Sequence, residues 1–332
     1  MRRFFFQSVI TAFTIVGSII GAGFISGKEI YEFFASEFSF SGIYLTFLLF
    51  AFLIGFTMQE NLSETSEKAV GLFVSVANIF ISGCMVAGLN EVYKSLFCQI
   101  EKVEILTVIS AILIFIISCK GIGATEKLNG VLIPIVIAVI IIFGLLKGNK
   151  TAVNLSPKTY GGVVKPAVYV GFNVILSTKV IKKSGEKLSP PFKILSSIIT
   201  SLIVCMLIWV ISLAVVNVDK SVEMPFRKLF VGNKKLCIIV DIITVFAIFT
   251  TLVSSFYTSL EIIPKQNGVF VKIIVFLLAL AISKIGFSSI VERVYPTVGI
   301  LSYAVIFITY LLSKIFLKGQ RARTFLPLKR KV

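Results

Sequence analysis

Three glycines interrupt the first long apolar segment of the chain, which covers residues 7–34. The interruption reads GSIIGAGF at residues 17–24, inside a segment long enough to cross a bilayer, since ~20 apolar residues span ~30 Å of hydrocarbon. Each glycine costs ~1 kcal/mol relative to alanine in a helix, and it also lets the backbone leave the helix. Two interpretations follow. Either the helix opens and its freed backbone groups bind an ion and a solute, or the small residues serve close helix packing.

The rest of the chain consists largely of further apolar segments. Hydrophobic residues make up 57% of its 332 positions, against ~45–50% in ordinary globular domains. Ten segments can be separated: 7–34, 42–58, 69–97, 105–118, 129–146, 163–181, 194–216, 236–263, 269–285 and 290–316. Ten spans of ~20 residues fill ~200 positions, which leaves short loops and two tails. We therefore predict an all-α integral membrane protein with one polytopic membrane domain over residues 1–332.

The charge of the chain indicates a membrane protein and not a nucleic-acid-binding protein. The net charge is +17, but the basic residues lie between the apolar segments and in the tail, residues 317–332, and do not form one face. Such a distribution fits the positive-inside rule. An even number of spans then places both termini in the cytoplasm, with the chain in the plasma membrane. The basic loop 182–193 agrees, whereas the lysines after the fifth and seventh segments do not.

Several chemistries are not expected from the composition. The chain has no histidine, and its five cysteines are scattered without paired spacing, so we expect structural thiols. No zinc-protease, nucleophile-elbow or phosphate-loop motif is found, which argues against an enzyme. The first apolar segment is too long for the core of a signal peptide, so we expect it to be retained.

The interrupted segments suggest two halves of five spans each, about residues 7–146 and 163–316. The sixth segment contains Gly171-Phe172-Asn173 and Ser177-Thr178-Lys179, and it occupies the same place in the second half as the first segment does in the first. Because five is odd, the halves would be inverted across the membrane. Paired interrupted helices are the sequence feature that points best to the binding site of a secondary transporter, which favours the open-helix interpretation of residues 17–24.

A specific resemblance supports this prediction. The run VGSIIGAGFISGKEI at residues 16–30, followed by Phe33-Phe34, is similar to the start of the bacterial YkvI-like membrane proteins. Gly171-Phe172-Asn173 and Phe249-Thr250-Thr251 are further matches. That family is placed in the amino acid–polyamine–organocation superfamily, which has the LeuT fold. The resemblance implies a 5+5 inverted repeat whose first and sixth helices are broken, and a solute site between them. The residues expected in that site are Gly21, Ala22, Gly23, Phe24, Gly171, Phe172 and Asn173.

The resemblance also implies a sodium ion between the first and eighth spans. Carbonyls of Gly17 and Ile20 would face the ion, and hydroxyls from the eighth span would complete a shell of oxygen ligands, which hard cations prefer. Those hydroxyls are Thr250, Thr251, Ser254 and Ser255. The alternative is that they only bond back to their own helix. Another sodium site of some relatives uses an asparagine where this chain has Phe24. No other cofactor is expected.

Ionisable residues within the spans are costly and are functional candidates. Glu29 lies just beyond the glycines and is a candidate for proton coupling, in competition with sodium; Glu91, Lys94 and Asp241 fit the membrane interface. The predicted function is a permease for a small zwitterion such as an amino acid, working by alternating access. The alternative is a solute sensor with a permease fold that does not transport. The expected partners are the solute and the bilayer, with no prediction of oligomeric state.

Overall fold

The computed structural model describes residues 2–60, 63–97, 101–119, 123–148, 160–186, 188–260 and 268–324. The first predicted span is divided into α1 (Arg2–Ile19), α2 (Ala22–Ile25) and α3 (Lys28–Phe33), followed by the short helix η1 (Ala35–Glu37). The rest of the first half consists of α4 (Phe40–Gln59), α5 (Glu64–Leu96), α6 (Val103–Ser118) and α7 (Gly123–Lys147). The second half begins with α8 (Gly161–Gly185) and α9 (Pro190–Val215), then α10 (Pro225–Lys228) and α11 (Lys234–Leu260). It ends with α12 (Gly268–Ser283), α13 (Phe287–Ser289), the π-helical turn η3 (Ile290–Val294) and α14 (Tyr295–Thr324).

Local chemistry fixes several of the helix starts. The Ser39 hydroxyl caps α4 by accepting a hydrogen bond from the Gly42 amide at 3.2 Å. Ser63 caps α5 in the same way through the Ser66 amide. Helix α9 opens with Pro190 and Pro191 in its first turn, where proline needs no helical donor. The helices of the second, third and seventh apolar segments therefore begin at capping or proline signals that can be identified in the sequence.

The apolar segments predicted from the sequence all coincide with helices in the described chain. Within the residues that the structure describes, six helices are long and apolar enough to cross a bilayer, and four shorter apolar helices of 10–17 residues accompany them. The six are α4, α5, α8, α9, α11 and the α13–α14 unit, and the shorter ones belong to α1, α6, α7 and α12. An all-helical membrane protein is therefore confirmed, whereas the ten-span inverted repeat stays a prediction.

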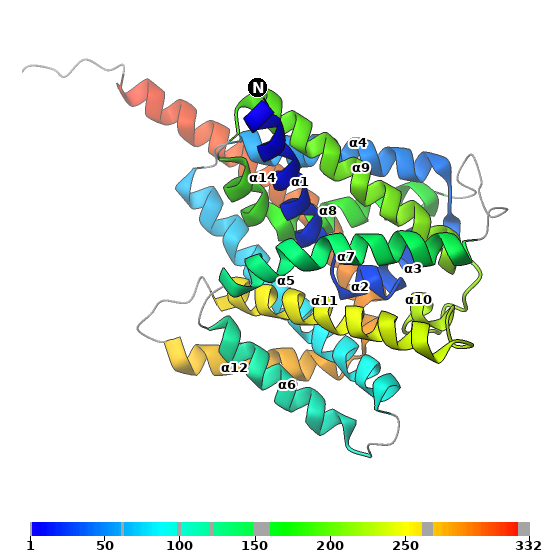
Figure 1. Cartoon of the computed structure of the whole chain (residues 1–332). Coiled ribbons are helices and arrows are strands. Elements are labelled where there is room, and N and C mark those ends of the chain that lie inside the picture. The colour runs from blue at the N-terminus through cyan, green and yellow to red at the C-terminus, as the bar shows by residue number, and fades with distance from the viewer. Residues whose placement is uncertain are drawn as a thin grey trace, which may run out of the picture.

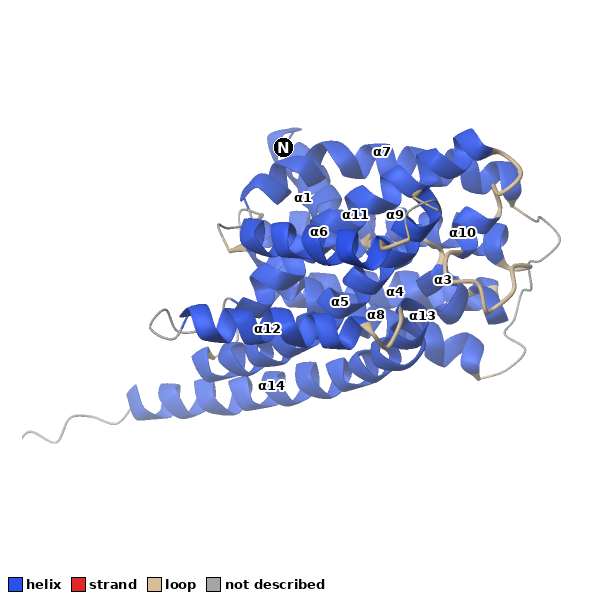
Figure 2. Ribbon diagram, turned by 90° about the horizontal axis from the view of Figure 1, so that it is seen from below, coloured by secondary structure: helices blue, strands red, loops and turns tan. Residues whose placement is uncertain are grey.

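The helices pack into one bundle with a distinct end. Helix α11 lies along α5, α4 lies against α8 and α9, and α14 lies against α8 (Figure 1). Short elements α3, α10 and α13 gather at one end of the bundle, while the C-terminal part of α14 projects from the other (Figure 2). We call the first of these the α10 end.

The sixth predicted span is not broken, which corrects the sequence prediction. Helix α8 continues without interruption through Gly171, Phe172 and Asn173. A Cβ atom at Gly171 would lie 2.5 Å from the Tyr303 ring and 2.9 Å from the Gly299 carbonyl. The glycine therefore allows α8 and α14 to approach closely, and for this segment the packing interpretation is the right one.

Candidate functional site

The first span opens at Ile20 and Gly21, as the sequence predicts. The Ile20 amide still donates to the Val16 carbonyl at 2.9 Å, but the Gly21 amide turns to the Ile19 carbonyl at 3.0 Å. Helical bonding resumes only when Ile25 donates to Gly21 at 3.1 Å. The carbonyls of Gly17 and Ile20 therefore lie between the last helical hydrogen bond of α1 and the first one of α2. They are the two carbonyls expected from the sequence to face an ion.

Within the predicted break, the extended residue is Gly21 and not Gly23. Gly21 has φ −101° and ψ −173°, and α2 has already begun at Ala22. Ala22, Gly23 and Phe24 are buried and helical. The opening is thus narrower than the sequence suggests, and it is followed by a second irregular point at Gly27, whose φ of 78° separates α2 from α3.

The eighth predicted span, α11, packs directly against the break. A Cβ atom at Gly21 would lie 3.5 Å from Thr251 Oγ1. Ser255, one turn further along the same helix face, is buried. Thr250 is also buried, but its hydroxyl donates back to the Ala247 carbonyl at 3.1 Å. Of the two hydroxyl pairs on α11, the pair with Thr251 is therefore the one that faces the first span, and Thr250 matches the helix-packing interpretation. Ser254 is partly exposed.

Glu29 returns from α3 to the break. Its side chain is buried, and a Cβ atom at Gly23 would overlap its carboxyl group. Gly23 is therefore small because a carboxyl group lies across it. The structure places this acidic group in the protein interior, beside the opened backbone, where an ionised group is costly.

An aromatic wall, formed by Phe33, Phe34, Phe50 and Tyr169, lies beside this region. The Tyr169 ring contacts Phe33 and Phe34 with ring centroids 5.3 Å and 5.2 Å away, and Phe50 at 6.3 Å. The Tyr169 hydroxyl is buried and has no hydrogen-bond partner among the described residues. Burying a hydroxyl that makes no hydrogen bond lowers the stability of the fold. A ligand that bonds to the hydroxyl would recover this free energy. Tyr169 was not predicted from the sequence, although it lies one helical turn before the predicted site residue Asn173.

Three residues of α8 were predicted to bind solute, Gly171, Phe172 and Asn173, and the structure does not place them all at the predicted solute site. The Asn173 side-chain amide donates to the Tyr169 carbonyl at 3.0 Å, and Phe172 stacks on Tyr295 at 4.3 Å. Both residues are buried. Gly171 instead faces Tyr303 of α14, whose hydroxyl donates to the Ala167 carbonyl at 2.7 Å. Gly171 belongs to the α8–α14 crossing.

A cluster of charges joins the first span to the α10 end. Lys28 is fully buried, and its Nζ lies 3.2 Å from Glu292 Oε1 of η3 and donates to the Lys220 carbonyl at 2.8 Å. Glu32 pairs more loosely with Lys165 and Lys220, at 3.6 Å and 3.7 Å. Glu29 was predicted from the sequence as a functional candidate, whereas Lys28, the adjacent ionisable residue in the same apolar segment, was not.

Similarity to solved structures indicates the fold of the chain. No family model matches the chain. The structure resembles Mhp1 in its inward-facing conformation, with a TM-score of 0.54 and 13% identity over 89% of this chain and 73% of that one. It also resembles a manganese transporter of Eremococcus coleocola, with a TM-score of 0.53 and 14% identity over 95% of this chain and 78% of that one. The fold therefore resembles that of LeuT-fold transporters.

Sequence similarity then points to one curated protein. The chain is 24% identical over 347 aligned residues, covering 94% of its own length and 96% of the relative, to the uncharacterized membrane protein YkvI of Bacillus subtilis strain 168. The resemblance deduced from residues 16–30 thus extends along the chain. The similar proteins are a membrane protein and transporters, in line with the expectation that the chain is not an enzyme.

Proposed function

We propose that this protein is a secondary transporter that moves a small zwitterion, such as an amino acid, by alternating access. The observation that carries the proposal is the opening of the first span at Ile20 and Gly21, beside the buried carboxyl group of Glu29. Irregular backbone at this depth is tolerated where it lines a cavity or is buried in protein. Opened helices are the usual way in which transporters present backbone dipoles to a solute.

The packing of the helices supports two inverted halves. Each span of the first half has an equivalent five spans later in the second half. For several packing pairs, replacing both helices by their equivalents gives a pair that is also in contact in the structure. Helix α4 packs on α8 as α9 packs on α1, α5 packs on α12 as α11 packs on α6, and α14 packs on α8 as α7 packs on α1. An odd number of spans per half inverts them across the membrane. We propose accordingly that both termini lie in the cytoplasm, on the side that the basic tail predicts.

The solute would bind between the break and the aromatic wall. Backbone groups around Gly21 and Gly23 would meet its charged ends, and Phe24, Phe172 and Asn173 would border the site. The Tyr169 hydroxyl, for which the described part of the chain offers no hydrogen-bond partner, would add one hydrogen bond to the solute. In this arrangement Gly171 sets the α8–α14 spacing and does not touch the solute.

For the coupling ion we propose sodium, bound by the carbonyls of Gly17 and Ile20 and by the hydroxyls of Thr251 and Ser255. The contact between Gly21 and Thr251 supports this location, and oxygen ligands suit a hard cation. Sodium would tie α1 to α11, so it should raise solute affinity, and solute should raise sodium affinity by the same factor. Proton coupling through Glu29 is the second candidate, favoured by the burial of that carboxyl group.

Binding and uptake in reconstituted liposomes test these proposals together. Radiolabelled amino acids should accumulate in liposomes with an inward sodium gradient and not in choline at the same pH. Thr251→Val should abolish the sodium effect, whereas Thr250→Val, the matched control, should retain it. Equal uptake in sodium and choline, combined with loss of pH dependence in Glu29→Gln, would establish proton coupling instead.

The competing function is a sensor that binds solute without moving it. Solute binding with no uptake under any ion gradient would support the sensor. Gly21→Leu fills the space between the break and Thr251, so it should abolish solute binding at the break in either case. Wild-type affinity at the break in Gly21→Leu would show that the break serves packing alone.

A further inference from the structure

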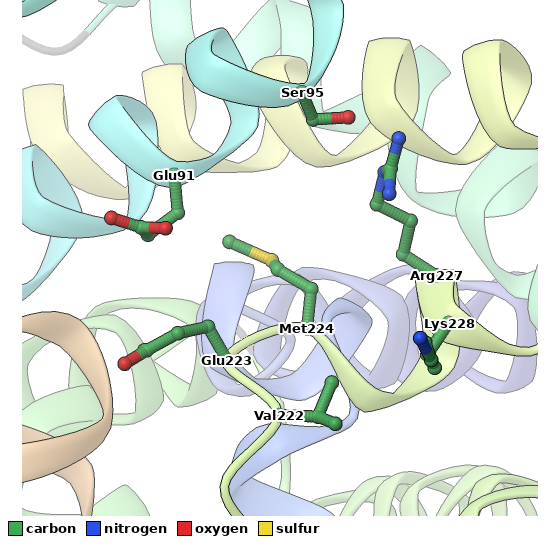
Figure 3. A pocket seen from close by; sticks show the side chains of 7 residues that line it. All are labelled: Glu91, Ser95, Val222, Glu223, Met224, Arg227 and Lys228. Carbon is green, nitrogen blue, oxygen red and sulfur yellow. The ribbon is translucent and has the colours of Figure 1, made fainter. Parts of the chain in front are cut away.

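A pocket of about 190 Å³ lies at the α10 end of the molecule. It sits between the last turns of α5 and the segment that carries α10 (Figure 3). Its lining comprises Glu91, Ser95, Val222, Glu223, Met224, Arg227 and Lys228. These residues belong neither to the first span nor to α8, so the pocket is distinct from the proposed central site.

The charges around the pocket are separated by sign. Glu91 and Glu223 lie on one side, and Arg227 and Lys228 lie on the other (Figure 3). The apolar Met224 stands between the two pairs. Two carboxylates and two cations cancel in formal charge, so the pocket has no net attraction for a simple anion or cation. It presents a dipole instead.

Contacts outside the pocket hold two of these groups in position. Glu223 Oε2 accepts hydrogen bonds from the Ser288 amide at 2.9 Å and from the Ser288 hydroxyl at 2.8 Å. Arg227 Nε donates to Asp241 Oδ1 at 2.7 Å. Asp241 is buried and also accepts from the Ser95 hydroxyl at 2.8 Å, so it is not the hydrated interface residue that the sequence suggested.

The same contacts leave binding capacity facing the pocket. Glu223 makes its bonds through one oxygen, which leaves the other. Arg227 meets Asp241 through Nε, which leaves its two terminal amino groups, and these can hold a carboxylate in bidentate fashion. Glu91 pairs with Lys94 at 2.8 Å, but that pair is exposed and weak, so a ligand cation can replace it.

We propose that this pocket is a second binding site for a small zwitterion. The ammonium group of the ligand would lie between Glu91 and Glu223, and its carboxylate would lie at Arg227 and Lys228. A short aliphatic chain would cover Met224. This inference rests on the pocket's own charges and stands independently of the proposed transport function. Through Glu223 and Asp241 the bound ligand would link α5, α10, α11 and α13.

The test uses the purified full-length protein with glycine, β-alanine and γ-aminobutyrate as zwitterionic probes. Acetate and methylammonium serve as probes that carry one charge only. Gly21→Leu blocks the central site, and thermal stability and calorimetric binding are measured in that background. We expect millimolar or tighter binding of at least one zwitterion and affinity at least about tenfold weaker for both single charges, because each satisfies only half of the pocket.

Two substitutions then locate the site. Glu223→Gln and Lys228→Gln should each weaken zwitterion binding by at least about tenfold; Lys228 is exposed and Glu223→Gln keeps an oxygen for Ser288, so folding is not at risk. Lys235→Gln makes the same charge change as Lys228→Gln outside the pocket, and should have no effect. The proposal is overturned if no zwitterion binds the Gly21→Leu protein, if single charges bind as well, or if both pocket variants bind as the parent does. Transport is measured on the chain with an intact Gly21, whereas binding at this pocket is measured on Gly21→Leu. A negative transport result would therefore not change the conclusion about the pocket.

Discussion

The two parts of the first span differ sharply in how they are held. Helix α1 exposes large apolar side chains such as Phe6 and Ile10. Its side-chain hydrogen bonds to neighbouring segments are long. The Ser8 hydroxyl donates to the Phe192 carbonyl at 3.3 Å, and the Thr11 hydroxyl donates to the Ser184 carbonyl at 3.4 Å. Neutral bonds of this length contribute at most about 1 kcal/mol each.

The part beyond the break, α2 and α3, is anchored much more firmly. Almost all of its residues are buried, including Lys28 with its ion pair to Glu292. The Phe226 amide also donates to the Ser26 carbonyl at 2.8 Å. Because the break removes helical coupling between the two parts, the contrast predicts that α1 moves while α2 and α3 stay with the α10 end.

The largest effect is expected from breaking the anchor at Lys28. Glu292→Gln removes the anion and leaves a fully buried ammonium group with the Lys220 carbonyl, so it should destabilise the protein by about 3 kcal/mol. Glu64→Gln breaks the exposed pair with Lys68 and should leave the stability of the protein almost unchanged. Thermal unfolding in one detergent compares the two. Equal, small losses would mean that the anchor is no stronger than a surface pair.

The joint between α2 and α3 should give the next largest effect. Gly27→Ala places a side chain at φ 78°, with its Cβ 3.2 Å from Phe226 and Val215, and should destabilise by about 1–2 kcal/mol. Gly232→Ala is the matched control, because no atom of the described residues lies within 4 Å of its added methyl group. A Gly27→Ala protein as stable as that control would show that the joint tolerates an ordinary residue.

Loosening α1 should have a smaller effect on stability but a clear effect on access. Thr11→Val removes the bond to Ser184 and should cost at most about 1 kcal/mol. Ser196 lies one turn before Thr200, whose hydroxyl reaches the Ala12 carbonyl at 3.5 Å, so Ser196 faces α1. A cysteine replacing Ser196, in a chain without its native thiols, should react faster with a hydrophilic reagent when Thr11→Val is present. Unchanged reactivity would contradict movement of α1.

The positions of the helices, and the break in the first of them, could be predicted from the sequence because apolar length and clustered glycines are local signals. The error at Gly171 has a physical cause. A glycine that opens a helix and a glycine that admits a neighbour look alike until the partner is known, and here the partner is Tyr303, far along the chain. Lys28 and Tyr169 were missed for the same reason, since their roles depend on Glu292 and on Phe33 and Phe34.

The smallest effect on stability, and the most specific one on function, is expected at the aromatic wall that the anchored part supports. Tyr169→Phe removes a buried hydroxyl that has no hydrogen-bond partner among the described residues, so it should change stability by less than about 0.5 kcal/mol while it weakens solute binding. Tyr303→Phe removes a hydroxyl that donates to the Ala167 carbonyl at 2.7 Å, so it should destabilise by about 1 kcal/mol and leave solute affinity unchanged. Thermal unfolding and equilibrium solute binding on both variants separate the two roles. If Tyr169→Phe binds solute as the wild type does, the solute does not reach the wall formed by α3 and α8, and the site lies nearer to α11.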